Sequence, residues 1–171
     1  DSLFAPATHE HSHGEGGVMS DAFEPQLVAF CCQHCAYAAA DLAGGTRLSY
    51  PDSLKIVQLP CTGRVDVLHV LQSFEDGADG VLVAGCLPGD CHYLKGNFYA
   101  RQRVEYVQGL LEQIGFETDR ARMVNISAAM GAQFAEVATE FAEHIRELGP
   151  NPLAPGRSPA RAEPETLEVS P

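Results

Sequence analysis

The chain has 171 residues, of which 45% are hydrophobic, and carries a formal net charge of -12. A chain of this length holds one α/β core rather than two. Nucleic acid and anionic membrane surfaces attract clustered Lys and Arg, so the acidic balance excludes both as general partners. A membrane-spanning helix needs about 18 consecutive apolar residues, and no run in the chain is that long. Residues 1–10 lack the basic and apolar regions of a signal peptide. We therefore expect a cytoplasmic protein with one domain.

The large apolar residues lie between two polar ends. Residues 1–24 mix Glu, Gly and Ser with alternate histidines and hold too little apolar surface to order themselves. These histidines are His9, His11 and His13. Histidines at this spacing can bind a metal ion, but we favour a solvated tail. Repeated prolines deny regular structure to residues 150–171. We predict tails at both ends and a folded domain over residues 25–149.

The first half of this domain predicts two strand and helix pairs. The apolar run Gln26–Cys32 is typical of a strand, and an Ala-rich helix over His34–Leu42 follows it, stopped by two glycines. Leu54–Leu59 is a second strand, ended by a Pro-Cys-Thr-Gly turn. Large apolar residues then fall near helical spacing over Val65–Phe74, which predicts a second helix.

The second half repeats the same alternation. Gly80–Gly85 is a continuous apolar run, typical of a strand buried on both faces. Asn97 is expected to cap a long helix whose apolar face includes Val104–Ile114. Met123–Ile126 predicts a short fourth strand, and an amphipathic helix over Phe134–Leu148 closes the domain.

This β-α-β-α-β-α-β-α order predicts an α/β fold. Helices should cover both faces of a four-stranded parallel sheet, joined by right-handed crossovers. We expect a flavodoxin-like three-layer sandwich with the first strand between the second and the third. In such sheets, ligands bind at the carboxyl ends of the strands where the strand order reverses.

The cysteines fall at or just after the carboxyl ends of the first three predicted strands. They are Cys31, Cys32, Cys35, Cys61, Cys86 and Cys91. Because the carboxyl ends of parallel strands share one edge of the sheet, we expect these thiols to gather in one pocket. Reducing compartments do not favour disulfides, so metal binding or redox chemistry is the leading interpretation.

Two metals suit four thiolates, zinc and an iron–sulfur cluster. Zinc is favoured by the C-x2-C pair Cys32 and Cys35 and by the nearby His34 and His92. No second C-x2-C pair follows, however, and an α/β core needs no zinc to hold it together. A [2Fe–2S] cluster is wider, so it suits ligands from separate strand ends and the C-x4-C pair Cys86–Cys91. The spacing favours the cluster and leaves zinc open.

Thiol–disulfide chemistry is a third interpretation. Cys32 and Cys35 lie at a strand–helix junction, where a helix N-terminus lowers the pKa of a cysteine. This leaves Cys61, Cys86 and Cys91 unexplained, unless they are small buried hydrophobes. No phosphate loop for a flavin follows the first strand, and no acid, base or nucleophile constellation is visible.

Several motifs together resemble a known family. They are Phe30–Tyr37, Ala40–Gly44, Cys61–Asp66, Gly77–Cys86 and Gly89–Tyr93. In order and spacing, over about residues 26–148, they resemble the delta subunit of methyl-viologen-reducing hydrogenase. The resemblance implies a non-catalytic subunit that carries one [2Fe–2S] cluster. It would relay electrons from a hydrogenase or formate dehydrogenase to the flavin (HdrA-like) subunit of heterodisulfide reductase, where the electrons are bifurcated.

The resemblance also implies a ligand set. The recurrent cysteines of the family fall on Cys32, Cys35, Cys61, Cys86 and Cys91, so five candidates compete for four places. The position of Cys31 is commonly aliphatic in the family. Gln33-His34 stands where Asn-Trp is frequent, a difference that could alter how the pocket excludes water.

Four polar residues near the cysteines have less specific roles. Asp66 and Asp90 are expected at a helix start and in a turn. Arg64 is either a partner for a reduced cluster or a solvated residue. His92 is either a hydrogen-bond donor to a thiolate, a partner contact or a polar turn residue.

Overall fold

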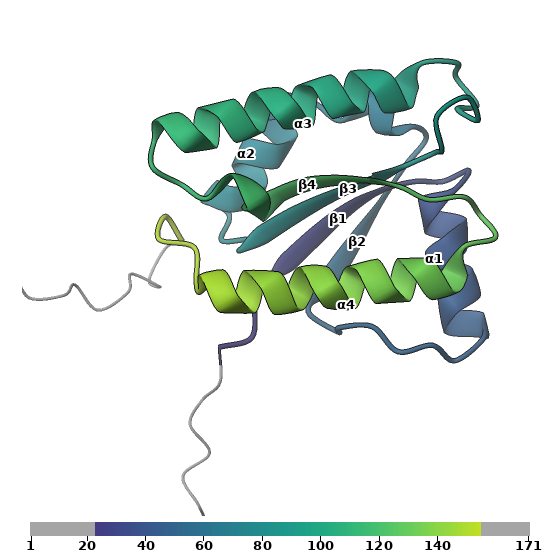
Figure 1. Ribbon diagram of the computed structural model, residues 1–171, viewed down its shortest axis with the longest axis horizontal. Helices are drawn as coiled ribbons and strands as arrows, with labels where there is room; N and C mark the ends of the chain where they lie inside the picture. Colours follow the sequence, from purple (N-terminus) through teal and green to yellow (C-terminus); the bar gives the residue numbers. More distant parts are fainter. Residues whose placement is uncertain (1–22, 155–171) are drawn as a thin grey trace, which may run out of the picture.

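The structure, a computed structural model, describes residues 23–154 (Figure 1). The predicted tails therefore lie almost entirely outside the described residues, and the histidines of residues 9–13 lie outside them. The strands and helices are β1 (Leu27–Cys32), α1 (Ala36–Gly45), β2 (Leu54–Leu59), α2 (Val67–Glu75), β3 (Gly80–Gly85), α3 (Gly96–Gln113), β4 (Ala121–Asn125) and α4 (Gly131–Leu148). Two short 3-10 helices, η1 (Thr62–Arg64) and η2 (Thr118–Arg120), precede α2 and β4.

The four strands form one parallel sheet in the order β2-β1-β3-β4. The predicted sheet and the predicted position of β1 between β2 and β3 are confirmed. Helices α1 and α4 cover one face, and α2 and α3 cover the other (Figure 1). The result is a three-layer, flavodoxin-like sandwich, in which the carboxyl ends of all four strands share one edge. None of the helices in residues 23–154 is long and apolar enough to cross a membrane.

The central strands supply both halves of the core. Successive side chains of a strand point to opposite faces, so in β1 Ala29 packs under α1 and α4, and Phe30 packs under α2 and α3. Every residue of β3 is buried, which confirms the prediction of a strand covered on both faces. The carboxyl edge of the sheet is therefore supported by a core packed on both faces.

All four helices begin at other residues than the sequence predicts, and α4 begins at Gly131 rather than at Phe134. Helix α1 begins at Ala36, after a turn that ends in Cys35, and α2 begins at Val67 because η1 occupies the residues before it. The prediction that Asn97 caps α3 is wrong, since Lys95 is the cap residue. The amide of Asn97 points instead into the loop after β3, where two backbone carbonyls accept its hydrogen bonds.

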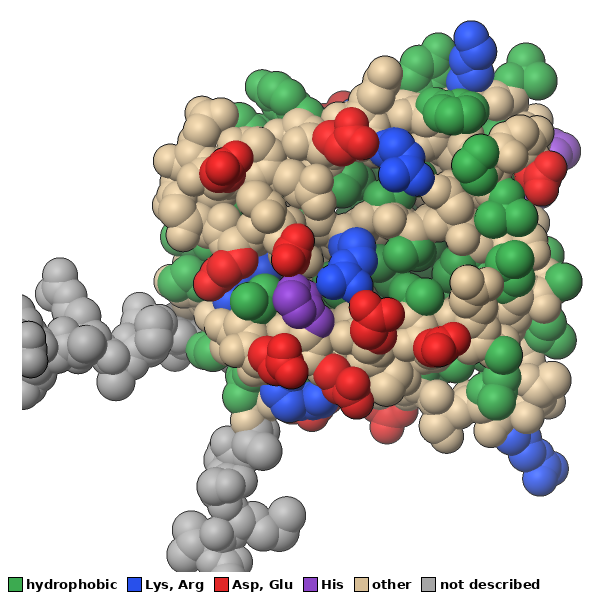
Figure 2. All heavy atoms as spheres, in the orientation of Figure 1, with side chains coloured by type: hydrophobic (Ala, Val, Ile, Leu, Met, Phe, Trp, Pro, Cys, Tyr) green, Lys and Arg blue, Asp and Glu red, His purple; other side chains and the backbone are tan. Residues whose placement is uncertain are grey.

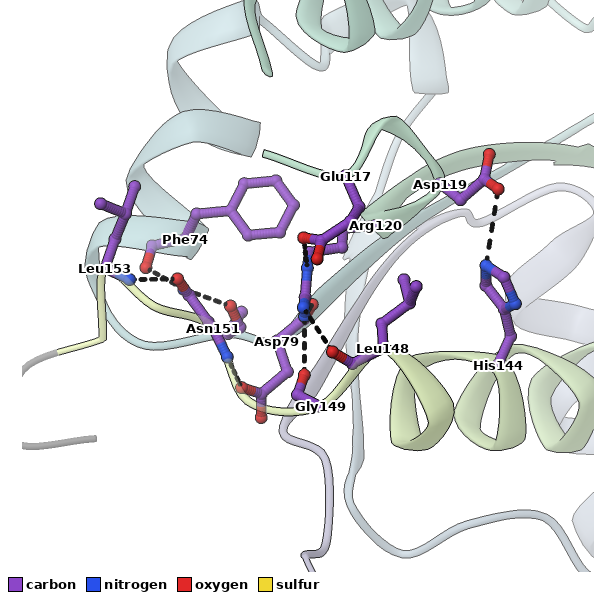
Figure 3. A network of polar contacts seen from close by, with 11 residues as sticks. Phe74, Asp79, Glu117, Asp119, Arg120, His144, Leu148, Gly149, Asn151 and Leu153 are labelled. Atoms are coloured by element: carbon purple, nitrogen blue, oxygen red, sulfur yellow. Dashed lines mark hydrogen bonds and ion pairs between the residues drawn. The ribbon is translucent and has the colours of Figure 1, made fainter. Parts of the chain in front are cut away.

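A buried polar network holds both ends of the described chain at the amino edge of the sheet (Figure 3). The carboxylate of Asp79 accepts hydrogen bonds from the backbone N–H groups of Gln26 and Asn151, both at 2.7 Å. The side chain of Asn151 is fully buried and donates to the carbonyls of Phe74 and Ala78, both at 2.8 Å. The chain after α4 therefore packs on the domain as far as the structure describes it.

Arg120 completes this network and is only 1% exposed. Its guanidinium donates to the carbonyls of Asp79 (3.1 Å), Gly149 (2.9 Å) and Leu148 (3.3 Å). Its Nε lies 2.8 Å from the carboxylate of Glu117. This hydrogen bond holds the pKa of Glu117 below its usual value. One buried side chain thus joins β3, η2 and the end of α4.

We expect Arg120→Met to lower the free energy of unfolding by about 3–5 kcal/mol, because it removes the partner of several buried polar groups at once. Urea unfolding measures the effect. The matched control is Arg146→Met, since Arg146 is exposed and pairs with the exposed Glu24. That change should shift the free energy by less than about 1 kcal/mol. Equal effects of the two substitutions would contradict the role given to Arg120.

Candidate metal centre

Five cysteines converge on the carboxyl edge of the sheet, as predicted from the strand ends. Cys32 is the last residue of β1, Cys86 follows β3 directly, and Cys61 follows β2 after one proline. Cys35 is the cap residue of α1, and Cys91 lies in the loop before α3. All five are buried and free.

Three of these thiols form a compact group. The sulfurs of Cys32, Cys35 and Cys86 all lie within 4.8 Å of one another. The Sγ atoms of Cys32 and Cys86 are 3.7 Å apart. Two thiolates around one tetrahedral ion stand about 3.8 Å apart, given metal–sulfur bonds of about 2.3 Å. The pair Cys32 and Cys86 therefore already has the spacing of two ligands on one metal ion.

The other two thiols, Cys61 and Cys91, lie together at the start of α3. A methyl group added to Gly96 would overlap the sulfur of Cys61 and would lie 3.3 Å from that of Cys91. Burial raises the pKa of Cys61, and the neighbouring thiols of Cys91 and Cys32 raise it further. The pair is thus continuous with the group of three.

Cys31 is the exception to the expectation that all the cysteines share one pocket. It lies one residue before the end of β1 and is fully buried in the core on the face that α1 and α4 cover. Burial raises its pKa to about 12. It is absent from the group of possible metal ligands among the described residues, in keeping with the aliphatic character that the family resemblance gives this position.

Hydrogen bonds and burial set the protonation of the group of three. The hydrogen bond from Cys35 lowers the pKa of Cys32 to about 5, and the same bond raises the pKa of Cys35. Burial raises the pKa of Cys86. An unpaired thiolate is costly in such surroundings, so a bound cation is the natural partner for several thiolates together.

Backbone N–H groups surround the sulfurs. Gly63 N–H donates to the Sγ of Cys61 at 3.4 Å. Burial alone would raise the pKa of Cys91, but the N–H groups of Asn97, Tyr93 and Gly96 lower it. Such donors stabilise negative charge on sulfur and tune the reduction potential of a bound cluster.

Side chains from α3 and β4 hold the loops that carry the cysteines. The amide of Asn97, which is 2% exposed, donates to the carbonyls of Cys86 (3.0 Å) and Leu87 (2.9 Å). Asn125 donates to the same Cys86 carbonyl at 2.5 Å and accepts from Arg101 at 2.6 Å. These positioning residues were missed by the sequence reasoning, because no local pattern marks an amide that reaches a distant carbonyl.

A second clamp holds the turn after Cys61. The guanidinium of Arg103 donates to the carbonyls of Gly63 (2.6 Å) and Val65 (2.8 Å). A Cβ on Gly63 would lie 2.7 Å from the Cα of Gly96, so η1 and the start of α3 touch backbone to backbone. Helix α3 therefore positions both cysteines of the pair.

The polar neighbours of the site lie at its surface. The rings of His34 and His92 stack with their centroids 4.0 Å apart, and both residues are exposed. Burial raises the pKa of Cys86, and the backbone N–H of His92 opposes that rise. Asp66 caps α2, and Asp90 lies exposed in the loop between Cys86 and α3, as expected.

Buried thiols from three strand ends, approached by backbone N–H groups, form a candidate thiolate metal centre on a flavodoxin-like domain. Comparison with known proteins identifies the family. The sequence profile of methyl-viologen-reducing hydrogenase, delta subunit, matches residues 27–149. The chain belongs to this family.

Curated relatives agree with this assignment. The iron-sulfur D subunit of the F420-non-reducing hydrogenase of Archaeoglobus profundus is 47% identical over 132 residues, which cover 77% of this chain and 96% of the relative. The vhu iron-sulfur D subunit of Methanocaldococcus jannaschii is 43% identical over 130 residues, which cover 76% of this chain and 97% of the relative. The A subunit of ferredoxin:CoB-CoM heterodisulfide reductase from Methanosarcina mazei is 42% identical over 126 residues, 74% of this chain but only 16% of that protein. The same domain therefore occurs both as a separate polypeptide and as part of a larger one.

Proposed function

We propose that this protein is a non-catalytic electron-relay subunit that holds one [2Fe–2S] cluster on the cysteines of its carboxyl edge. It would pass electrons from a hydrogenase or formate dehydrogenase-type partner to an HdrA-like flavin subunit, within a cytoplasmic electron-bifurcating complex. The observation that carries the proposal is the convergence of five buried thiols from three strand ends.

The donor set fits such a group. Its ligands would be four of Cys32, Cys35, Cys61, Cys86 and Cys91, and four thiolates are what a [2Fe–2S] cluster takes. Three of the sulfurs lie within 4.8 Å of one another, one pair of them already has the spacing of metal ligands, and backbone N–H groups approach Cys61 and Cys91. When bound, the cluster supplies one-electron transfer.

The protein's own residues would hold, shield and tune that group. The core beneath the cysteines excludes water from one side, and Asn97 and Arg103 fix the loops that carry Cys86 and Cys61. Burial next to backbone N–H donors sets the environment of the sulfurs. These contacts would suit a site that takes up and passes on electrons.

The partners are proposed from the relatives. The hydrogenase relatives are named iron-sulfur subunits. In Methanosarcina mazei the domain is part of a heterodisulfide reductase polypeptide. A domain that occurs with a hydrogenase in some organisms and inside a heterodisulfide reductase in another is well suited to lie between the two.

Metal and sulfide analysis of anaerobically purified protein tests the proposal. We expect about two irons and two sulfides per chain, visible absorption that bleaches on reduction, and a paramagnetic signal from the reduced form. Stoichiometric zinc without iron would instead support a zinc-binding interaction module. Metal-free protein with one reactive thiol at Cys32 or Cys35 would support a thiol oxidoreductase.

A further inference from the structure

Large apolar side chains lie exposed beside the cysteine pair, where the loop after Cys91 enters α3. They are Tyr93 (53% exposed), Leu94 (82%), Phe98 (47%) and Tyr99 (52%). We call these four residues the aromatic shelf. Figure 2 shows hydrophobic side chains gathered at the upper right, over the loop before α3 and the start of that helix. A contiguous exposed apolar patch on a soluble domain marks an interaction site more often than isolated apolar residues do.

The backbone holds the most exposed of these side chains outward. Leu94 has a φ of 68°, a left-handed conformation that residues other than glycine seldom adopt. Its N–H donates to the Cys91 carbonyl at 2.9 Å, so the turn that imposes this conformation begins at a cysteine of the candidate centre. Strain of this kind persists where the surrounding structure enforces it, and it concentrates at functional sites. The side chain of Leu94 therefore projects from the domain, where an apolar pocket of a partner can receive it.

The shelf borders the cysteines directly. A hollow of about 490 Å³ is lined by Cys61, Gly96, Tyr93 and Tyr99, with Arg64 at its side. Tyr93 also packs edge-on against the ring of His92, with centroids 5.1 Å apart. A protein seated on the shelf would cover the side of the candidate centre where Cys61 lies.

The charges around the shelf favour one kind of occupant. Arg64 and Lys95 are exposed beside it, although the chain as a whole carries a net charge of -12. Two copies meeting shelf to shelf would bring these cations together and repel each other. A partner whose apolar contact surface is rimmed by carboxylates would instead be attracted and oriented.

We propose that the aromatic shelf is the docking face for the flavin-carrying, HdrA-like partner. The proposal rests on the proposed function and adds to it the face on which that partner binds. In Methanosarcina mazei this domain lies within a heterodisulfide reductase polypeptide, so the domain and the rest of that protein are permanent neighbours there. Permanent interfaces are more hydrophobic than transient ones, and the shelf is an apolar surface at the candidate centre.

The test compares two variants in a binding titration with the HdrA-like protein encoded in the same genome. Leu94→Asn removes the apolar anchor, and asparagine tolerates a positive φ better than leucine does, so this variant should fold. Ile114→Asn is the matched control, since Ile114 is 64% exposed at the far end of α3, roughly 27 Å away by the rise of the helix. Phe98→Ser is a second variant on the shelf.

We expect Leu94→Asn and Phe98→Ser each to raise the Kd at least tenfold, with the visible spectrum of the purified chain unchanged, and Ile114→Asn to leave the Kd unchanged. Wild-type affinity in both shelf variants would overturn the docking face, and so would equal weakening by Ile114→Asn. If the unmodified chain does not bind the flavoprotein, the partner and the docking face both fail. Iron content is measured separately, so failure of the cluster assignment is distinguishable from failure of the docking face.

Discussion

Replacing Cys61 with serine is expected to remove nearly all of the about two irons per chain that a [2Fe–2S] protein holds. Cys61 and Cys91 form a pair at the start of α3, whereas the sulfurs of the other three thiols lie within 4.8 Å of one another. A two-iron cluster needs two thiolates on each iron. Neither member of the pair belongs to the group of three sulfurs that lie within 4.8 Å of one another, so we expect no spare thiol to replace it.

The same reasoning predicts where the spare cysteine lies. Cys91→Ser should lose iron as Cys61→Ser does. Among Cys32, Cys35 and Cys86, one serine variant should keep a cluster, because three sulfurs within 4.8 Å of one another compete for two places. Iron and sulfide analysis of the five single variants measures this pattern.

Cys31→Ala is the matched control for these variants. It also removes a buried thiol, but one in the core outside the group of possible ligands. Its iron content should equal that of the unmodified chain, with a loss of stability of about 1 kcal/mol for the missing sulfur. A full cluster in Cys61→Ser, or its loss in Cys31→Ala, would contradict the ligand set.

The second large effect is expected from Gly96→Ala. An added methyl group would overlap the sulfur of Cys61, and the backbones of Gly96 and Gly63 already touch. The variant must push η1 away from α3 or turn Cys61 aside, and overpacking of this kind costs about 1–3 kcal/mol of folding free energy. We expect low iron content together with reduced stability, measured by metal analysis and urea unfolding.

Gly109→Ala tests whether the effect of Gly96→Ala comes from the contact with Cys61 or from placing an alanine in helix α3. Gly109 lies in the same helix α3, and a methyl group there would meet no atom within 4 Å. Alanine should therefore stabilise the helix by about 0.5–1 kcal/mol and leave the iron content unchanged. If Gly96→Ala keeps the iron content and gains stability as Gly109→Ala does, the close approach of Gly96 to Cys61 is not needed for cluster binding.

Much of the fold follows from local patterns in the sequence. Leu54–Leu59 and Gly80–Gly85 were predicted with the observed bounds, because short apolar runs between turn residues leave little choice of structure. The order of the sheet followed from the alternation of strands and helices, since right-handed crossovers allow few arrangements. The gathering of the cysteines followed in turn, because parallel strands end at one edge.

The details of the site depend on contacts between distant segments. Asn97 has the side chain of a cap residue, and its local sequence predicts that role. In the structure its amide binds carbonyls 10 and 11 residues away, because burial beside the loop after β3 offers partners that solvent does not. The touching glycines of η1 and α3 and the burial of Arg120 have no local signal either.

The sequence by itself determined the parallel sheet, the position of β1 and the edge at which the thiols meet, because these follow from periodicity and from the rules of strand connection. Only the tertiary structure decided that the thiols divide into three and two, that Cys31 turns into the core, and that an apolar shelf borders the pair. These features depend on how loops well separated along the chain pack against one another, and side-chain packing across such separations leaves no repeat in the sequence.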